Sequence, residues 1–258
     1  MYRKILFMLL LCCFACLSLD AQKPLRKPLK PTQSSNAGND GKSNSASRPS
    51  KPASGTSSSA TPSKQPVKSG SSAPRIVATG SIAGHDYVDL GLSVKWATCN
   101  VGATSPSGYG NYYAWGETSP KSEYTLENSV TNEKNMGDIA GDSRYDVARA
   151  NWGGSWRMPT AAEIQELVNK CKTRWITYNG HKGRLVTGPN GKSIFLPAVG
   201  ENCHSSPYGV GKCGRYWSST PRKSDEEFDS YYLYFSDGGF AYARYNRFSG
   251  LTVRPVSE

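Results

Sequence analysis

The sequence lacks the residue patterns of the common catalytic centres, and only three of its 258 residues are histidines. His85, His181 and His204 each lie outside any recognisable nucleophile–base pattern, and no Gly-x-Ser-x-Gly turn is present. The chain also lacks an apolar run of about 20 residues, the length that a helix needs to cross a bilayer. We therefore expect neither catalytic residues nor a transmembrane segment.

The first 21 residues have the three parts of a secretory signal peptide. Arg3 and Lys4 provide the positive start, residues 5–19 form an apolar stretch, and Ala21 is a small residue at the expected cleavage point. The sequence therefore predicts an exported protein, which is located at the cell surface, in the outer envelope or outside the cell.

A lipid anchor at Cys16 is an alternative to simple cleavage. Ala15 is the small residue that precedes a lipid-modified cysteine, but Phe14 and Cys13 fit this pattern poorly. No glycine or serine spacer follows Cys16, so the sequence favours cleavage after Ala21.

Residues 22–74 contain no aromatic residue and almost no branched aliphatic residue, but they hold 14 Ser and 8 Pro. Such a segment cannot bury enough apolar surface to offset the loss of chain entropy on folding. We expect residues 22–74 to be a disordered Ser/Pro/Lys-rich linker.

The positive charge is unevenly distributed. The linker carries nine Lys or Arg residues and one acidic residue, whereas residues 75–258 carry 20 Lys or Arg against 18 Asp or Glu. The linker therefore holds most of the net charge of +11. Because this charge lies in a segment without aromatic side chains that could stack on bases, we expect no nucleic-acid partner.

Four of the seven cysteines lie in residues 75–258. An even number in an exported chain favours disulfides, and three connectivities are open. Cys203 and Cys213 are close enough in sequence to close one loop, and Cys99 with Cys171 would tie an early strand to a helix. Buried thiols at Cys99 and Cys171 are the alternative. His204 beside Cys203 lacks a second nearby pair of zinc ligands, so we expect no metal and no other cofactor.

Residues 75–258 are long enough for one domain with a core. Thr160 and Glu163 have the spacing of a capping box, and apolar residues follow at helical spacing at Ile164, Leu167, Val168 and Cys171. Residues 144–150, preceded by Ser143, predict a shorter helix.

Short segments between turn residues predict strands in the rest of the domain. They cover residues 87–90, 94–98, 175–178, 184–187, 193–196, 232–235, 240–243 and 251–256. Asn190 and Gly191 favour a hairpin between two of these strands. Leu233 and Phe235 alternate with Tyr232 and Tyr234, so we expect one apolar face and one face available to solvent.

Tyrosine and arginine are concentrated in the last 30 residues. These residue types dominate recognition surfaces because they combine contact area, stacking and hydrogen bonding. The side chains that we expect to bind a ligand are Tyr232, Tyr234, Arg244, Tyr245, Asn246 and Phe248. Tyr231 belongs to the same cluster, and a position in the core is the alternative for it.

Several long motifs resemble the Fibrobacter succinogenes major paralogous domain family of Bacteroidetes envelope proteins. The resemblance covers nearly all of residues 80–258, and its motifs are YVDLGLSVKWA at 87–97, NVGA at 100–103, YAWGE at 113–117, WGGSWRMPT at 152–160, YWSS at 216–219 and GLTVRPV at 250–256. It implies an α+β domain with a C-type-lectin-like fold, small twisted antiparallel sheets, two helices and long loops.

This fold is similar to that of formylglycine-generating enzymes and of receptor-binding domains diversified by retroelements. The catalytic cysteine arrangement of the former is not evident, and the calcium-and-sugar signatures of animal lectins are absent. The segment from Tyr216 onward resembles the variable region of the diversified domains. That resemblance implies a constant set at Leu233, Phe235, Gly250, Leu251 and Val253. It implies an exposed, changeable set at Tyr232, Tyr234, Ala241, Ala243, Arg244, Tyr245, Asn246, Phe248 and Ser249.

The sequence thus predicts a cell-envelope or secreted module that recognises an extracellular protein or glycan and has no catalytic activity. A structural or adhesin component without its own ligand is the first alternative. An enzyme of unrecognised type is the second.

Overall fold

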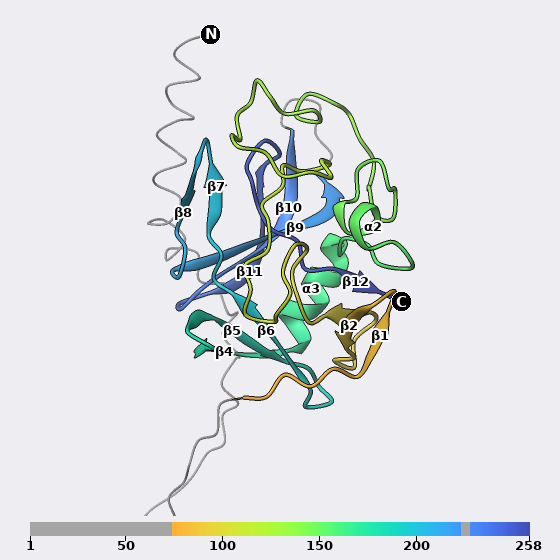
Figure 1. Ribbon diagram of the computed structural model, residues 1–258, viewed down its shortest axis with the longest axis vertical. Helices are drawn as coiled ribbons and strands as arrows, with labels where there is room; N and C mark the ends of the chain where they lie inside the picture. Colours follow the sequence, from red (N-terminus) through yellow and green to blue (C-terminus); the bar gives the residue numbers. More distant parts are fainter. Residues whose placement is uncertain (1–73, 223–227) are drawn as a thin grey trace, which may run out of the picture. The chain divides into compact units, whose positions relative to one another are not determined.

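The computed structural model describes residues 74–222 and 228–258 (Figure 1). The predicted signal peptide and, apart from Pro74, the predicted linker lie outside these residues. The described residues form small antiparallel sheets with two helices, which is the α+β class.

The first sheet joins the two ends of the domain. It has the strand order β1 (Gly80–Ile82), β2 (His85–Val88), β3 (Lys95–Ala97) and β12 (Val256–Ser257). The C-terminal strand β12 pairs with β3 through Val256 and Trp96. The beginning and the end of the domain therefore stabilise each other.

Two three-stranded sheets form most of the rest. One has the order β4 (Lys172–Tyr178), β5 (His181–Thr187) and β6 (Ser193–Pro197), and the predicted hairpin around Asn190 and Gly191 connects β5 to β6. The other has the order β11 (Phe240–Asn246), β10 (Asp229–Ser236) and β9 (Cys213–Pro221). A short hairpin of β7 (Glu201–Cys203) and β8 (Ser206–Tyr208) completes the strands.

The capping box predicts the longer helix correctly. Helix α3 (Ala161–Lys170) begins after Thr160, whose side chain accepts a hydrogen bond from the Glu163 amide, while the Glu163 carboxylate accepts one from the Thr160 amide. Ile164 and Leu167 are buried on one face of this helix.

The shorter helix begins later than we expected. Helix α2 (Val147–Trp152) is capped by Asp146 rather than by Ser143. The Oδ1 atom of the Asp146 carboxylate accepts hydrogen bonds from both the Ala148 and the Arg149 amides, at 2.9 and 3.0 Å. A buried carboxylate satisfies more of the first-turn donors than a serine hydroxyl does, which explains the shift.

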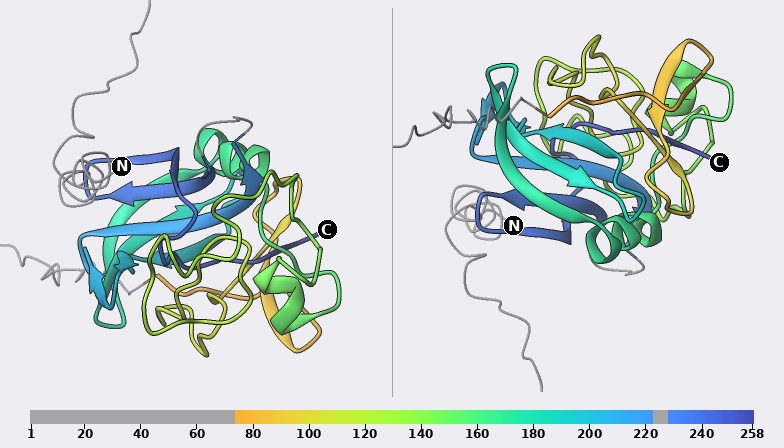
Figure 2. Two further views of the ribbon diagram at one scale, coloured as in Figure 1. Left: turned by 90° about the horizontal axis from the view of Figure 1, so that it is seen from above. Right: turned by 90° about the horizontal axis from the view of Figure 1, so that it is seen from below.

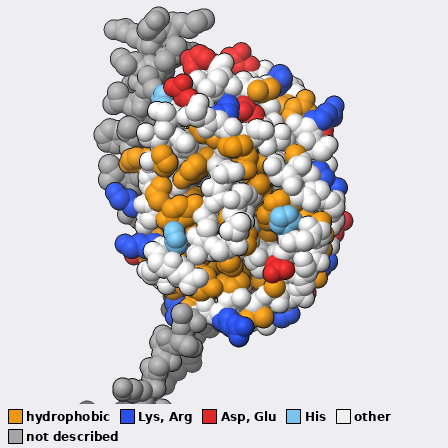
Figure 3. Space-filling model, viewed as in Figure 1, with side chains coloured by type: hydrophobic (Ala, Val, Ile, Leu, Met, Phe, Trp, Pro, Cys, Tyr) orange, Lys and Arg blue, Asp and Glu red, His pale blue; other side chains and the backbone are white. Residues whose placement is uncertain are grey.

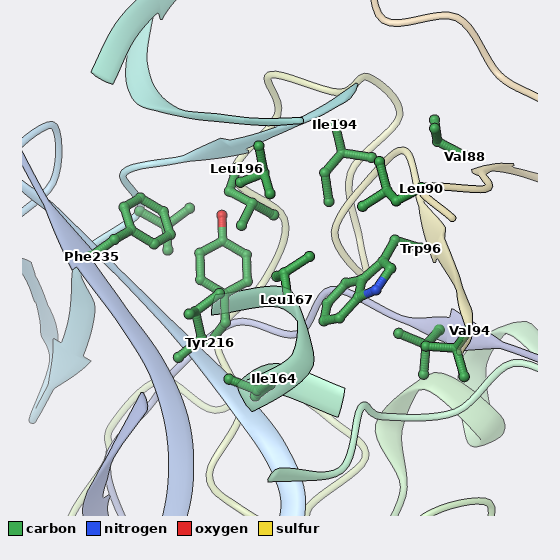
Figure 4. Close-up of a cluster of buried hydrophobic side chains, with 14 of the residues drawn as sticks. Val88, Leu90, Val94, Trp96, Ile164, Leu167, Ile194, Leu196, Tyr216 and Phe235 are labelled. Carbon is green, nitrogen blue, oxygen red and sulfur yellow. The ribbon is translucent and has the colours of Figure 1, made fainter. Parts of the chain in front are cut away.

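Helix α3 covers one face of the β9–β11 sheet, and it contacts all three of its strands. Ile164 and Leu167 point into a cluster of buried side chains that the sheets supply (Figure 4). Other labelled members of this cluster are Val88, Leu90, Val94, Trp96, Ile194, Leu196, Tyr216 and Phe235.

The opposite face of the β9–β11 sheet is also packed. Trp217, Tyr232 and Tyr234 belong to a second buried cluster, together with Trp115 and Val253. Part of this cluster comes from the irregular segment 98–146, which the views from above and below show beside the blue strands (Figure 2). Our expectation that this face is available to solvent is wrong at Tyr232 and Tyr234, because the long loops cover it in place of a second helix.

Buried arginines hold the irregular segments in place. Arg254 donates hydrogen bonds to the Ala97 and Thr98 carbonyls at 3.1 and 3.0 Å and to the Asn100 side chain at 2.8 Å. Loop carbonyls have no ladder partner, so a buried guanidinium with five donors satisfies several of them at once.

Candidate functional site

Tyr231, Tyr242 and Arg244 form the surface that we call the β11 patch. Tyr231 is paired with Arg244 across β10 and β11, so their side chains lie on the same face of the sheet. The Tyr231 and Tyr242 ring centroids are 6.2 Å apart. Tyr242 is 42% exposed, and Arg244 is also exposed. Tyr231 is half-buried, so the patch presents the Tyr242 ring, part of the Tyr231 ring and one positive charge to solvent.

Arg215, Tyr232, Tyr234 and Tyr245 form the arginine–tyrosine cluster on the opposite face of the same sheet. The Arg215 guanidinium carbon lies 4.6, 5.6 and 5.9 Å from the ring centroids of Tyr245, Tyr234 and Tyr232. Such distances allow cation–π attraction. The cluster therefore combines a charge with three aromatic faces in a buried setting.

Glu201 of β7 completes the electrostatics of this cluster. One of its carboxylate oxygens lies 3.6 Å from a guanidinium nitrogen of Arg215, and both side chains are buried. Burial by itself would lower the pKa of Arg215, but the neighbouring Tyr232, Tyr245 and Glu201 raise it overall. Arg215 thus remains charged within the cluster.

The predicted ligand-binding residues are divided between the two faces. Tyr232, Tyr234 and Tyr245 belong to the arginine–tyrosine cluster, whereas Arg244 and Asn246 lie on the face of the β11 patch. The Tyr232 side chain is 2% exposed and the Tyr234 side chain is 7% exposed. Adjacent residues of a strand point to opposite faces, so Arg244 and Tyr245 cannot form one flat contact surface.

The remaining members of the changeable set follow the strand alternation. Ala241 and Ala243 lie on the face of the arginine–tyrosine cluster, and Phe248 beyond the strand is half-buried. Ser249 is buried, in contrast to the exposed position that we expected. Leu233, Phe235, Leu251 and Val253 are buried, as expected of the constant set.

Three residues of these two surfaces were not predicted from the sequence, namely Tyr242, Glu201 and Arg215. For Tyr231 the sequence left recognition and a core position open. Only the strand register reveals the place of Tyr231 and Tyr242. Nothing local in the sequence links Glu201 to Arg215, because they meet through the packing of β7 on β9.

The expected disulfides are not formed, since no disulfide bond joins any two of Cys99, Cys171, Cys203 and Cys213. The Cys213 thiol is directed to the Gly209 carbonyl of its own turn at 3.7 Å, and the Cys203 sulfur lies 3.3 Å from His204 Nδ1. Burial raises the pKa of the Cys171 thiol to about 11.

A separate exposed apolar area lies at the end of the β7–β8 hairpin. Tyr208 is 45% exposed and Val210 is 38% exposed. On the face seen in Figure 3, apolar side chains gather toward the middle and charged side chains toward the margin. Isolated exposed apolar residues are common on protein surfaces, so Tyr208 serves below as a control for Tyr242.

In residues 74–222 and 228–258 no group of three or more His, Cys, Asp or Glu side chains is arranged to hold a metal ion. Within the same residues no helix has the length and apolar character needed to cross a membrane.

Comparison with known proteins gave no match. No family model matches the chain, and no curated protein and no solved structure is similar to it. The choice between the two surfaces therefore depends on their geometry.

Proposed function

We propose that this chain is an exported recognition protein that binds an extracellular protein or glycan through the β11 patch. We further propose that residues 75–258 are a member of the Fibrobacter succinogenes major paralogous domain family with a C-type-lectin-like fold. The motif resemblance and the capping-box start of α3 support this assignment.

One observation carries the binding proposal. Tyr242 and Arg244 are both exposed, they are two residues apart on the same face of β11, and Tyr231 lies beside both of them. Aromatic and arginine side chains that contact each other and reach solvent are the residue types that dominate binding energy. The buried arginine–tyrosine cluster supports the sheet from behind and holds the patch in a fixed geometry.

The test is a protein and glycan array probed with the exported protein. We expect the double variant Tyr242→Ala/Arg244→Ala to lose at least about tenfold in affinity for any ligand found, since truncating a hot-spot tyrosine or arginine costs about 2 kcal/mol or more and tenfold corresponds to about 1.4 kcal/mol. The double variant Tyr208→Ala/Arg174→Ala is the matched control, because it removes another exposed tyrosine and another exposed arginine from other strands.

The outcome separates the proposal from its rivals. Equal loss in both double variants would indicate nonspecific contact, and unchanged binding in the first would exclude the β11 patch. A protein that binds nothing on the arrays but assembles with envelope components would support the structural alternative.

Export is tested by sequencing the amino terminus of the protein recovered from cells. Cleavage after Ala21 leaves Gln22 as the first residue. A lipid-modified Cys16 at the terminus would instead show that the protein is anchored.

A further inference from the structure

Strand β11 is an edge of its sheet. The strand order is β11-β10-β9, so β11 is hydrogen-bonded to β10 on one side only. The backbone groups along its other side are those that another strand would pair with.

The register identifies these backbone groups. Ser236 donates a hydrogen bond to the Gly239 carbonyl at 3.0 Å across the turn, and the pairing then continues without a shift from Phe235–Phe240 to Asp229–Asn246. Bonded and non-bonded pairs alternate in an antiparallel ladder. Phe240, Tyr242 and Arg244 therefore direct their N–H and C=O groups away from β10. In the described part of the chain none of these outward groups has a backbone hydrogen bond.

This edge lacks most of the features that prevent strand pairing. Proteins protect exposed edges with proline, bulges, several charges or a covering segment. β11 has seven residues, contains no proline and carries one charge, Arg244, while the irregular register lies on the other side of β10. An added strand would therefore find a regular ladder.

The side chains along β11 specify the chemistry of that strand. On the face of the β11 patch, which is also the face that α3 contacts, a new strand would place alternate side chains beside Tyr242 and Arg244. Among the described residues Asp229 interacts electrostatically with Arg244 from the same face but lies beyond 4.0 Å, so an acidic side chain at closer range is favoured beside Arg244. On the face of the arginine–tyrosine cluster the partly buried Ala241 and Ala243 are apolar, so apolar side chains of the new strand are favoured beside them.

We propose that β11 captures an extended acidic peptide segment of a partner protein, which becomes a fourth strand of the β9–β11 sheet. This inference depends on the proposed recognition function and narrows the ligand from a protein or glycan to a protein. The backbone ladder provides affinity, and the alternation of acidic and apolar side chains provides specificity.

The probe is a seven-residue peptide of alternating valine and glutamate, labelled with a fluorophore and added to the exported protein. In antiparallel addition the residues opposite Tyr242 and Arg244 are the glutamates, and their own amides then bond to β11. Methylation of the glutamate amide nitrogens should weaken binding at least about tenfold, since it removes several ladder hydrogen bonds. Methylation of the valine amide nitrogens should leave binding unchanged, because these amides face away.

Two protein variants provide the complementary comparison. Tyr242→Pro removes the outward N–H group at an edge position that tolerates proline, whereas Tyr242→Ala retains this group and removes the same ring. We expect Tyr242→Pro to bind the peptide at least about tenfold more weakly than Tyr242→Ala. Replacing the glutamates of the peptide by lysines should also weaken its binding, because Arg244 would repel the lysine ammonium groups. Circular dichroism of each variant verifies that the sheet is intact.

Hydrogen exchange gives a direct readout. The amides of Phe240, Tyr242 and Arg244 should exchange more slowly when the peptide is bound, while the Tyr208 amide should not change.

Other results would overturn the inference. If both methylated peptides bind equally well but Tyr242→Ala/Arg244→Ala abolishes binding, the patch recognises side chains, and the proposed function stands without strand addition. If no peptide binds while the arrays yield a glycan ligand, the partner is a glycan and the proposed peptide capture by β11 is wrong. Concentration-dependent dimers with protected β11 amides in the absence of peptide would make a second copy of the chain the occupant.

Discussion

Arg244 and Arg247 are three residues apart at the end of β11, yet they have opposite environments. Arg244 is exposed and belongs to the β11 patch. Arg247 is 2% exposed, and its guanidinium carbon lies 4.4 Å from the Trp115 ring centroid. The same residue type is thus exposed to solvent at one position and holds loops in place at the other.

The hydrogen bonds of Arg247 explain the difference. Its guanidinium donates to the Ser230 hydroxyl and to the Thr131 and Lys134 carbonyls at 3.1, 3.3 and 2.8 Å. It connects the end of β11 to a loop more than 110 residues earlier in the chain. The buried charge of Arg247 is tolerated because its N–H groups satisfy loop carbonyls that have no partner in a helix or a sheet.

The largest expected effect comes from truncating these two arginines in turn. Arg247→Ala should lower the free energy of unfolding by about 4 kcal/mol, because it leaves buried acceptors without a donor and removes the stacking on Trp115. Arg244→Ala should lower it by less than about 0.5 kcal/mol. Urea unfolding followed by tryptophan fluorescence measures both. Similar losses of unfolding free energy in the two variants would show that burial does not distinguish Arg247 from Arg244.

Asp146 extends the comparison to buried acidic groups. Its Oδ1 accepts from the Ala148 and Arg149 amides, and its Oδ2 accepts from the Gly141 and Met158 amides at 2.7 and 2.9 Å. Asp146→Asn should lower the free energy of unfolding by about 3 kcal/mol, because an amide NH2 would then face two N–H donors.

The control for Asp146 is Asp142, a partly exposed carboxylate four residues earlier. Hydrogen bonds from Arg144 lower the pKa of Asp142 to about 2. Asp142→Asn should leave the urea midpoint nearly unchanged. A large loss for Asp142→Asn would show that exposed ion pairs matter more in this loop than we infer.

Two tyrosines of neighbouring strands give a smaller contrast. Tyr232 packs against Trp217 and Tyr245, with ring centroids 6.3 and 5.5 Å away. Tyr232→Leu should lower the free energy of unfolding by about 2 kcal/mol through lost packing and ring contacts. Tyr242→Leu should change stability little but weaken ligand binding. The opposite pattern would reverse our assignment of the two faces.

The smallest expected effect is the pH dependence at His85. Its ring is stacked on Trp152 with centroids 3.8 Å apart, and burial lowers its pKa from 6.5. Folding therefore favours the neutral ring, so this contribution to stability is complete above pH 6.5 and is lost as the pH falls through the lowered pKa. The free energy of unfolding should be lower at pH 5.0 than at pH 7.5, and His85→Phe should abolish the part of this difference that His85 causes. An unchanged pH profile in His85→Phe would assign the effect to other groups.

Local signals predicted the elements that depend on neighbouring residues. Thr160 and Glu163 cap α3 as their spacing indicates, and the strands on both sides of Asn190 and Gly191 form the expected hairpin. The short helix itself was predicted, but its start was wrong, because the choice of Asp146 as cap depends partly on Met158, twelve residues later.

The candidate site was predicted less well than the fold. The last strands were recognised as rich in tyrosine and arginine, but the residues chosen as one surface lie on two faces. Strand alternation separates Arg244 from Tyr245, and this information is in the sequence. The burial of Tyr232 and Tyr234 cannot be read from the sequence pattern, because it depends on packing against loops from residues 98–146.

The sequence by itself determined the class of the domain, the start of α3 and the concentration of tyrosine and arginine near the C-terminus. These features depend on residue types and on spacing within a few residues, where backbone hydrogen bonding dominates. Only the tertiary structure decided that Arg247 is buried while Arg244 is exposed, and that β11 has an open edge. Burial and strand pairing depend on which distant segments lie nearby, and no local pattern encodes that arrangement.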